Sequence, residues 1–246
     1  MDLYVPLNLQ MPSPMEYTMY NTLLQLPLFQ GMSRTELSEI IERAKFHFVK
    51  VEAGSTVFAQ GEPCTKLAFL LGGELTAETV APYGTFSFVE VHDTPIMIEP
   101  YSLFGRRPCY KATYTAQGEV SLLTIDKQYL YGVLDSYEVF RMNFFNQLSA
   151  RVEQLHERVW SITPQQLEGR LIHFIHSLCT TPRGTKILRV KMEDLARLLD
   201  DTRLNVSHIL NRWQAEGLIA MRRKEFLFYK VECLFDREYK RHCPAG

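Results

Sequence analysis

The stretch VFRMNFFNQLSARVEQLHERVWSI, residues 139–162, predicts a long helix with a single apolar seam. Its apolar residues alternate at spacings of three and four, an average of about 3.5 residues that is typical of helices paired along a seam. The heptad a positions are Phe145, Val152 and Val159, and the d positions are Leu148, Leu155 and Ile162. β-Branched residues at a with Leu at d favour a parallel two-helix pair. We therefore expect a dimer interface here; the alternative is an amphipathic helix lying on its own domain.

The composition is that of a globular chain of one or two domains. Of its 246 residues, 46% are apolar and 22% are charged, which is enough apolar sequence for a large core. The N-terminus lacks the pattern of a signal peptide and no apolar run is long enough to span a membrane, so we expect a cytoplasmic protein without membrane contact. The five cysteines are scattered and form no C-x-x-C pair. This pattern fits a reducing compartment and argues against a disulfide framework or a zinc ribbon.

Between Phe46 and Ile125 the sequence changes to short alternating segments separated by glycines. The segments are FHFVKV, STVFAQ, KLAFLL, ELTAETVA, TFSFVEV, PIMIE and EVSLLTI. Many short strands with glycine turns predict an antiparallel β-barrel or β-roll. Helices are expected at 17–26, after Ser33, which forms a capping box with Glu36, and after Asp126.

The charge is divided unevenly along the chain. Residues 1–162 carry 12 Lys/Arg against 18 Asp/Glu, whereas residues 163–246 carry 15 against 10. A basic C-terminal third on an acidic body suggests contact with a polyanion, although this charge is also that of an ordinary solvated surface.

The segment MEDLARLLDDTRLNVSHILN, residues 192–211, predicts a helix-turn-helix. Leu195 and Leu199 form the buried face of the first helix, and Ala196 is the small residue at the helix crossing. Asp200 stands at the turn position, where aspartate tolerates the left-handed conformation. Thr202 caps the second helix. The buried face of the second helix is assigned to Val206 and Ile209; two ordinary amphipathic helices are the alternative.

A second helix in the major groove would read bases with its early, outward residues. These are Arg203, Leu204, Ser207 and His208. A strand-turn-strand pattern follows in IAMRRKEFLFYKV, and its basic turn is placed like a wing. Phosphate contacts are expected from Lys191, Thr202, Asn205, Arg212, Arg222, Arg223 and Lys224, and these give register and salt dependence.

Taken in order, these pieces resemble the CRP/FNR family of bacterial transcription regulators from about Leu23 to Val231. The resemblance is carried by LPLFQGMS, EAGSTVFAQGEP, KLAFLLGGEL and DLARLLDDTRLNVSHILNRWQAEGLI. It implies an α+β fold with a cyclic-nucleotide-binding-like antiparallel β-roll (double-stranded β-helix) at 17–135, a dimerisation helix at 136–162 and a winged helix-turn-helix at 163–235. It also implies a homodimer on a pseudo-palindromic operator in double-stranded DNA, with RNA polymerase as a partner and no enzymatic activity.

The sensor region departs from the nucleotide-binding members of that family. Where they carry a Gly-Glu pair for the ribose, this chain has Gly105 and Arg106, and their phosphate-binding Arg corresponds to Lys111, followed by Thr113. Lysine is a point charge without the bidentate fork of arginine. We therefore place an effector site at these four residues and expect a small-molecule effector other than cyclic AMP. No cofactor is identified.

Two other readings remain open from the residues alone. The first is a ligand- or haem-sensing β-roll whose DNA binding is lost or secondary, with His47 and His92 as candidate haem ligands. The second is a metal or haem site at His173, His176 and Cys179, which recur every three residues along one expected helix.

Overall fold

The computed structural model describes residues 14–43, 45–93 and 95–236. The helices are α1 (Pro14–Gln25), η1 (Pro27–Phe29), α2 (Arg34–Arg43), η2 (Pro82–Gly84), α3 (Pro100–Leu103), α4 (Lys127–Ser136), α5 (Glu138–Trp160), α6 (Leu167–Leu178), α7 (Met192–Leu198) and α8 (Arg203–Ala215). The strands are β1 (His47–Val51), β2 (Thr56–Phe58), β3 (Lys66–Gly72), β4 (Leu75–Val80), β5 (Phe86–His92), β6 (Ile96–Ile98), β7 (Thr113–Ala116), β8 (Val120–Asp126), β9 (Lys186–Val190), β10 (Ile219–Arg222) and β11 (Glu225–Phe228). The α+β fold class is confirmed.

The N-terminal part is an antiparallel roll built from two facing sheets. One sheet has the strand order β1-β8-β3-β6, and β5, β4, β7 and β2 follow one another in the second. Phe29, Phe69 and Phe140 are buried in the core of the roll. The ring centroid of Phe29 lies 5.9 Å from that of Phe69 and 5.4 Å from that of Phe140. The capping box is confirmed: the Ser33 N–H donates to the Glu36 carboxylate at 2.8 Å and the Glu36 N–H donates to Ser33 Oγ at 3.2 Å. β7 was not predicted.

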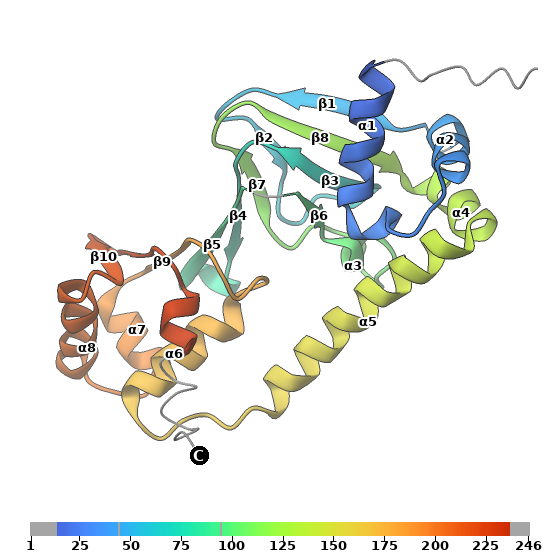
Figure 1. Ribbon diagram of the computed structural model, residues 1–246. Coiled ribbons are helices and arrows are strands. Elements are labelled where there is room, and N and C mark those ends of the chain that lie inside the picture. Colours follow the sequence, from blue (N-terminus) through green and yellow to red (C-terminus); the bar gives the residue numbers. More distant parts are fainter. Residues whose placement is uncertain (1–13, 44, 94, 237–246) are drawn as a thin grey trace, which may run out of the picture.

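Helix α5 leaves the roll and runs past it as a single long rod (Figure 1). Five of the six predicted seam residues are exposed, and the four of them within α5 are Phe145 (49%), Val152 (65%), Leu155 (46%) and Val159 (80%). Leu148 is half-buried against the core of the roll. The helix ends earlier than predicted, because Ser161 is extended and Pro164 disfavours helix before it. Ile162 therefore lies outside α5, which corrects its assignment as a helical d position, and it is 90% exposed.

The C-terminal part is a winged helix domain that folds back toward the roll (Figure 1). Its core is formed by α6, α7 and α8 together with β9, β10 and β11. The connection at 161–166 contains no helix or strand, in keeping with the expected hinge at Thr163 and Pro164. No helix in the described ranges is long and apolar enough to cross a membrane.

The two parts are joined by strand pairing that was not predicted. β9 lies between β11 of the wing and β5 of the roll, so one antiparallel sheet of order β10-β11-β9-β5-β4-β7-β2 runs through both. Phe88 of β5 is 3% exposed and belongs to the core of the winged helix domain. The roll and the winged helix domain therefore share a sheet as well as the α5 connection.

Candidate nucleic-acid interface

Local chemistry forms the helix-turn-helix in the way the sequence predicts. Leu195, Ala196 and Leu199 are buried between α7 and α8. Asp200 adopts φ +49°, the left-handed conformation that ends α7. Thr202 Oγ1 accepts the N–H of Asn205 at 3.2 Å and so caps α8.

The residues that α8 buries differ from the prediction. Val206 is buried as expected, but Ile209 is only partly buried. Leu210 and Trp213, both 0% exposed, fill the space against α6 instead. The Trp213 indole N–H donates to Glu168 at 2.9 Å, which satisfies the one polar atom of this buried ring. Trp213 was not predicted as a core residue, although its spacing of seven residues from Val206 places it on the same helix face.

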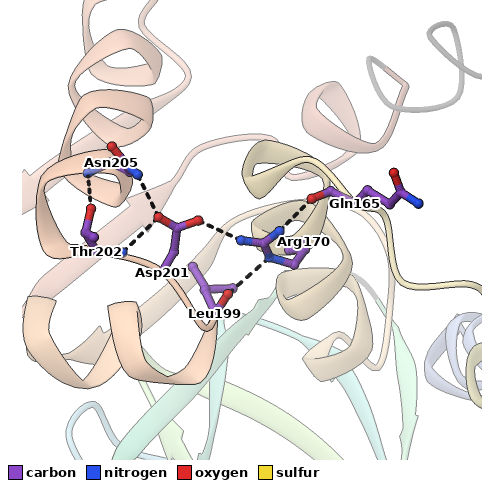
Figure 2. Close-up of polar contacts among 6 residues, drawn as sticks. All are labelled: Gln165, Arg170, Leu199, Asp201, Thr202 and Asn205. Atoms are coloured by element: carbon purple, nitrogen blue, oxygen red, sulfur yellow. Dashed lines mark hydrogen bonds and ion pairs between the residues drawn. The ribbon is translucent and has the colours of Figure 1, made fainter.

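A polar network ties the turn to α6 (Figure 2). The Asp201 carboxylate accepts hydrogen bonds from the Thr202 N–H and the Asn205 side chain, each at 2.8 Å. Its other oxygen lies 2.7 Å from the Arg170 guanidinium. Arg170 also donates to the carbonyl oxygens of Leu199 (3.1 Å) and Gln165 (2.6 Å). The Asn205 bond first, then the Thr202 N–H and Arg170, hold the pKa of Asp201 below its usual range.

Replacing Arg170 by methionine should therefore loosen the turn. The variant leaves a carboxylate and two carbonyl oxygens without their donor, and we expect the free energy of unfolding of the winged helix domain to fall by about 2 kcal/mol. Denaturant unfolding followed by Trp213 fluorescence measures this. The matched control is Arg197→Met, because Arg197 is 81% exposed at its side chain and pairs only within α7; it should cost less than about 0.5 kcal/mol. Equal losses in the two variants would show that the network does not hold the turn.

The outward face of α8 carries the predicted base-reading residues. Arg203, Leu204 and His208 are exposed, and Ser207 is half-buried. Arg203 lies 3.3 Å from the carboxylate of Glu193, an exposed pair that a DNA phosphate or base can replace. Asn211, one helical turn after Ser207, donates to its hydroxyl at 3.3 Å and extends the same face. Asn211 was missed, although the i+4 spacing from Ser207 was visible in the sequence.

The predicted phosphate-contacting residues divide into two groups. Lys191, Thr202 and Asn205 are exposed around the N-termini of α7 and α8, but Asn205 also holds Asp201. Arg212 lies near the C-terminal end of α8, two turns after Asn205, where its guanidinium is 2.7 Å from Glu168 and half exposed. The structure thus gives Arg212 a partner inside the domain.

The wing is a hairpin of β10 and β11 with its turn at Arg223 and Lys224. Lys224 adopts φ +62° and both turn residues are exposed. Arg222 has a partner within the hairpin, Glu225, at 3.9 Å. A cleft of about 610 Å³ lies between the wing, Lys191 and the β4–β5 hairpin tip at Tyr83 and Gly84. The tip of a roll hairpin therefore stands beside the basic wing.

The roll contains a second cavity of about 310 Å³, enclosed by the strands, α5 and residues 180–181. Of the four predicted effector residues only Lys111 lines it. Gly105 and Arg106 are exposed beside α3, and the Thr113 hydroxyl accepts the Gln60 N–H at 3.1 Å. The structure does not bring the four residues together around one cavity.

A carboxylate of the chain itself occupies the donor cluster beside Lys111. Glu99 accepts the backbone N–H groups of Lys111 (2.8 Å) and Ala112 (3.0 Å) and the hydroxyls of Ser102 (2.7 Å) and Tyr114 (3.2 Å). Burial, then the charge of Glu99, raise the pKa of Tyr114 well above its ordinary value, so its hydroxyl stays protonated and donates. Donors of this kind bind anionic groups, and here the Glu99 carboxylate already accepts their hydrogen bonds. No sequence pattern identified Glu99.

The histidine and cysteine candidates do not converge on a metal site. His173 Nε2 lies 2.8 Å from the Ser161 hydroxyl, and the Cys179 thiol, fully buried, donates to the Ile175 carbonyl oxygen. Burial raises the pKa of this thiol to about 12, which disfavours the thiolate that binds metals. His47 is partly exposed, 3.7 Å from Asp126, whereas His92 is buried. Over 14–43, 45–93 and 95–236, no group of three potential ligands forms a metal site.

The geometry defines a class of protein: a β-roll joined by a long helix to a winged helix-turn-helix domain. Comparison with family models agrees, because residues 48–137 match the cyclic nucleotide-binding domain and residues 169–234 match the Crp-like helix-turn-helix domain. Together the two models cover more than half of the chain. It belongs to the CRP/FNR family of transcription regulators, as the sequence resemblance indicated.

Individual relatives are distant. The chain is 22% identical over 218 residues to the CRP-like cAMP-activated global transcriptional regulator of Mycobacterium tuberculosis (strain H37Rv), an alignment covering 85% of this chain and 95% of the relative. The crystal structure of the sensor domain of the transcriptional regulator DNR from Pseudomonas aeruginosa has a TM-score of 0.50 at 24% identity, covering 62% of this chain and 98% of the other. The Thermus thermophilus catabolite activator protein gives a TM-score of 0.46 at 16% identity, with coverages of 86% and 97%.

Proposed function

We propose that this protein binds operator DNA as a homodimer and that a small molecule other than cyclic AMP controls it. The observation that carries this proposal is the exposed, polar and basic face formed by α8 and the wing at one end of the molecule. Arg203 is assigned to a base edge, since arginine gives guanine a bidentate contact. Lys191, Arg223 and Lys224 are assigned to phosphates. Since operator DNA lies in the bacterial cytoplasm, the regulator would act there, with RNA polymerase as its partner.

The proposed dimer interface is the exposed stripe of α5. Phe145, Val152, Leu155 and Val159 are only partly covered by their own chain, and a second copy of α5 would remove them from water. A two-fold dimer places two recognition helices about 34–36 Å apart, one turn of duplex, and this separation requires a pseudo-palindromic site.

The proposed effector site is the roll cavity rather than the four residues assigned from the sequence. Its walls include Lys111 and Ala112 of the roll, Arg151 of α5 and Thr180 after α6, so an occupant would touch all three parts of the chain. Glu99 supports an effector other than cyclic AMP, because its carboxylate holds the backbone donors beside Lys111 and would repel a cyclic phosphate.

Salt-dependent DNA binding tests the function directly. Operator sites are first selected from random duplexes. The binding constant is then measured between about 50 and 200 mM salt, where affinity that depends on phosphate contacts falls steeply. Arg223→Ala and Lys224→Ala should each reduce the slope of log K against log salt by about 1. Arg203→Ala should lose about 1–3 kcal/mol of discrimination at one base position.

Arg107→Ala is the control, since Arg107 is an exposed arginine on the roll, and its slope should equal that of the unaltered protein. If no duplex binds in a salt-sensitive way, the alternative of a sensor that does not use DNA would replace this proposal.

A further inference from the structure

The largest of the clefts described lies at the junction of α5 and α6; it adjoins the roll cavity, with which it shares Gln154, and no α8 residue lines it. Its volume is about 670 Å³, within the range of small-molecule sites. Its apolar walls come from four separate segments: the connection after α5, α6, the loop before β9 and the last described turn. The apolar residues are Ile162, Pro164, Ile172, Pro182 and Phe235.

The proposed dimer seam does not close this cleft. The α5 residues that line it are Gln154, Glu157 and Arg158. These fall at heptad positions c, f and g, whereas the seam uses positions a and d. Of the seam residues only Ile162, which is beyond the end of the helix, also lines the cleft. A ligand site here is therefore compatible with a dimer.

The charged groups of the cleft favour an anion. The Arg158 guanidinium is half-buried, and among the described residues no ion pair joins it to a carboxylate. Glu157 lines the same cleft but is exposed and makes no ion pair with it. Burial, followed by the charges of Arg158 and His173, lowers the pKa of His176, so this imidazole is neutral beside the arginine. A partly desolvated, unpaired guanidinium gains most from a bound carboxylate.

We propose that this cleft binds a small apolar carboxylate. The carboxylate pairs with Arg158, and the hydrocarbon body packs on Ile172 and Phe235. The site shares no residue with the proposed DNA-binding face, borders the proposed effector site at Gln154, and touches both helices that flank the hinge. A neutral or cationic molecule of the same length lacks the interaction with Arg158.

The test is isothermal titration of the full chain with decanoate, and with decyltrimethylammonium as the cation of equal tail length. We expect one saturable decanoate site per chain and at least tenfold weaker binding of the cation. Arg158→Gln should weaken decanoate at least tenfold, and Arg158→Lys should retain most of the affinity. Arg183→Gln, a neighbouring exposed arginine outside the cleft lining, is the control and should bind within twofold of the unaltered chain.

Thermal unfolding of each variant checks that the substitutions leave the fold intact, and Arg151→Gln reports on the roll cavity. Equal affinity for decanoate and the cation would overturn the proposal. It would also be overturned if Arg158→Gln bound as well as the unaltered chain, or if Arg151→Gln and not Arg158→Gln abolished binding. None of these readouts involves DNA, so failure here is distinct from failure of the regulator function.

Discussion

Lys186→Met is expected to destabilise the junction between the roll and the winged helix domain by about 3–5 kcal/mol. Lys186 Nζ lies 2.9 Å from the Glu90 carboxylate, and the two side chains are 1% and 7% exposed. Glu90 also accepts the N–H groups of Thr180 and Thr181. Removing the ammonium leaves a buried carboxylate without its counter-charge, which is the costly way to break a buried pair. Amide hydrogen exchange of residues 86–90 and 186–190 measures the loss.

The matched control is the same substitution in an exposed pair. Lys50 Nζ also lies 2.9 Å from a glutamate, Glu119, but these side chains are 74% and 67% exposed. Lys50→Met should cost less than about 1 kcal/mol. The double variant Lys186→Met with Glu90→Gln should be more stable than Lys186→Met alone, because it buries no unpaired charge. If amide hydrogen exchange in Lys186→Met matched that of the unaltered protein, the ion pair would not be what holds β5 and β9 together.

The same junction should weaken in acid. Burial raises the pKa of Glu90, but the Lys186 charge and the Thr180 bonds outweigh it and hold this pKa below 4.5. Burial likewise lowers the pKa of the neighbouring His92 below 6.5. Both groups bind protons more readily when unfolded, so their contribution is complete above pH 6.5 and falls as the pH drops through the folded pKa values.

Strand β9 shows why this junction could not be predicted from the sequence. KILRV has charged residues at its first and fourth positions, and as an isolated segment it resembles a solvated connection. Its pairing is set by partners distant in the chain: Glu90 lies opposite Lys186, and Arg189 lies 2.8 Å from Glu78 of β4 and 3.1 Å from Glu225 of the wing. Tertiary contacts of this kind override local propensity.

The helix-turn-helix was predictable because its determinants are local. Asp200 in the left-handed turn and the Thr202 cap depend on residues within three or four positions. Arg170 is the part of the same unit that local reasoning missed, since it reaches Asp201 from another helix. Glu99 is a similar case: a buried carboxylate surrounded by donors 3–15 positions away has no periodic signature.

Val152→Glu combined with Val159→Glu is expected to convert the protein to a monomer and to weaken operator binding at least 100-fold. Both residues are a positions, 65% and 80% exposed in the single chain, so the substitutions do not disturb its core. In a parallel pair each glutamate faces its copy, which places like charges together on a desolvated seam. Sedimentation at micromolar concentration measures the mass, and titration of the selected operator measures the affinity.

The size of the loss in affinity follows from the geometry of two linked half-sites. Once one recognition helix is bound, the second binds at a high effective concentration, and this typically gains two to four orders of magnitude. A monomer loses that gain while each α8 keeps its own contacts, so the doubly charged variant should still bind a half-site with the affinity of the isolated head. Asn146→Glu with Trp160→Glu is the control, because it adds the same two charges at b positions, and it should remain a dimer with unchanged affinity. If the seam variant stayed dimeric and bound the operator normally, the interface would have to lie elsewhere, and the exposed stripe of α5 would need another partner.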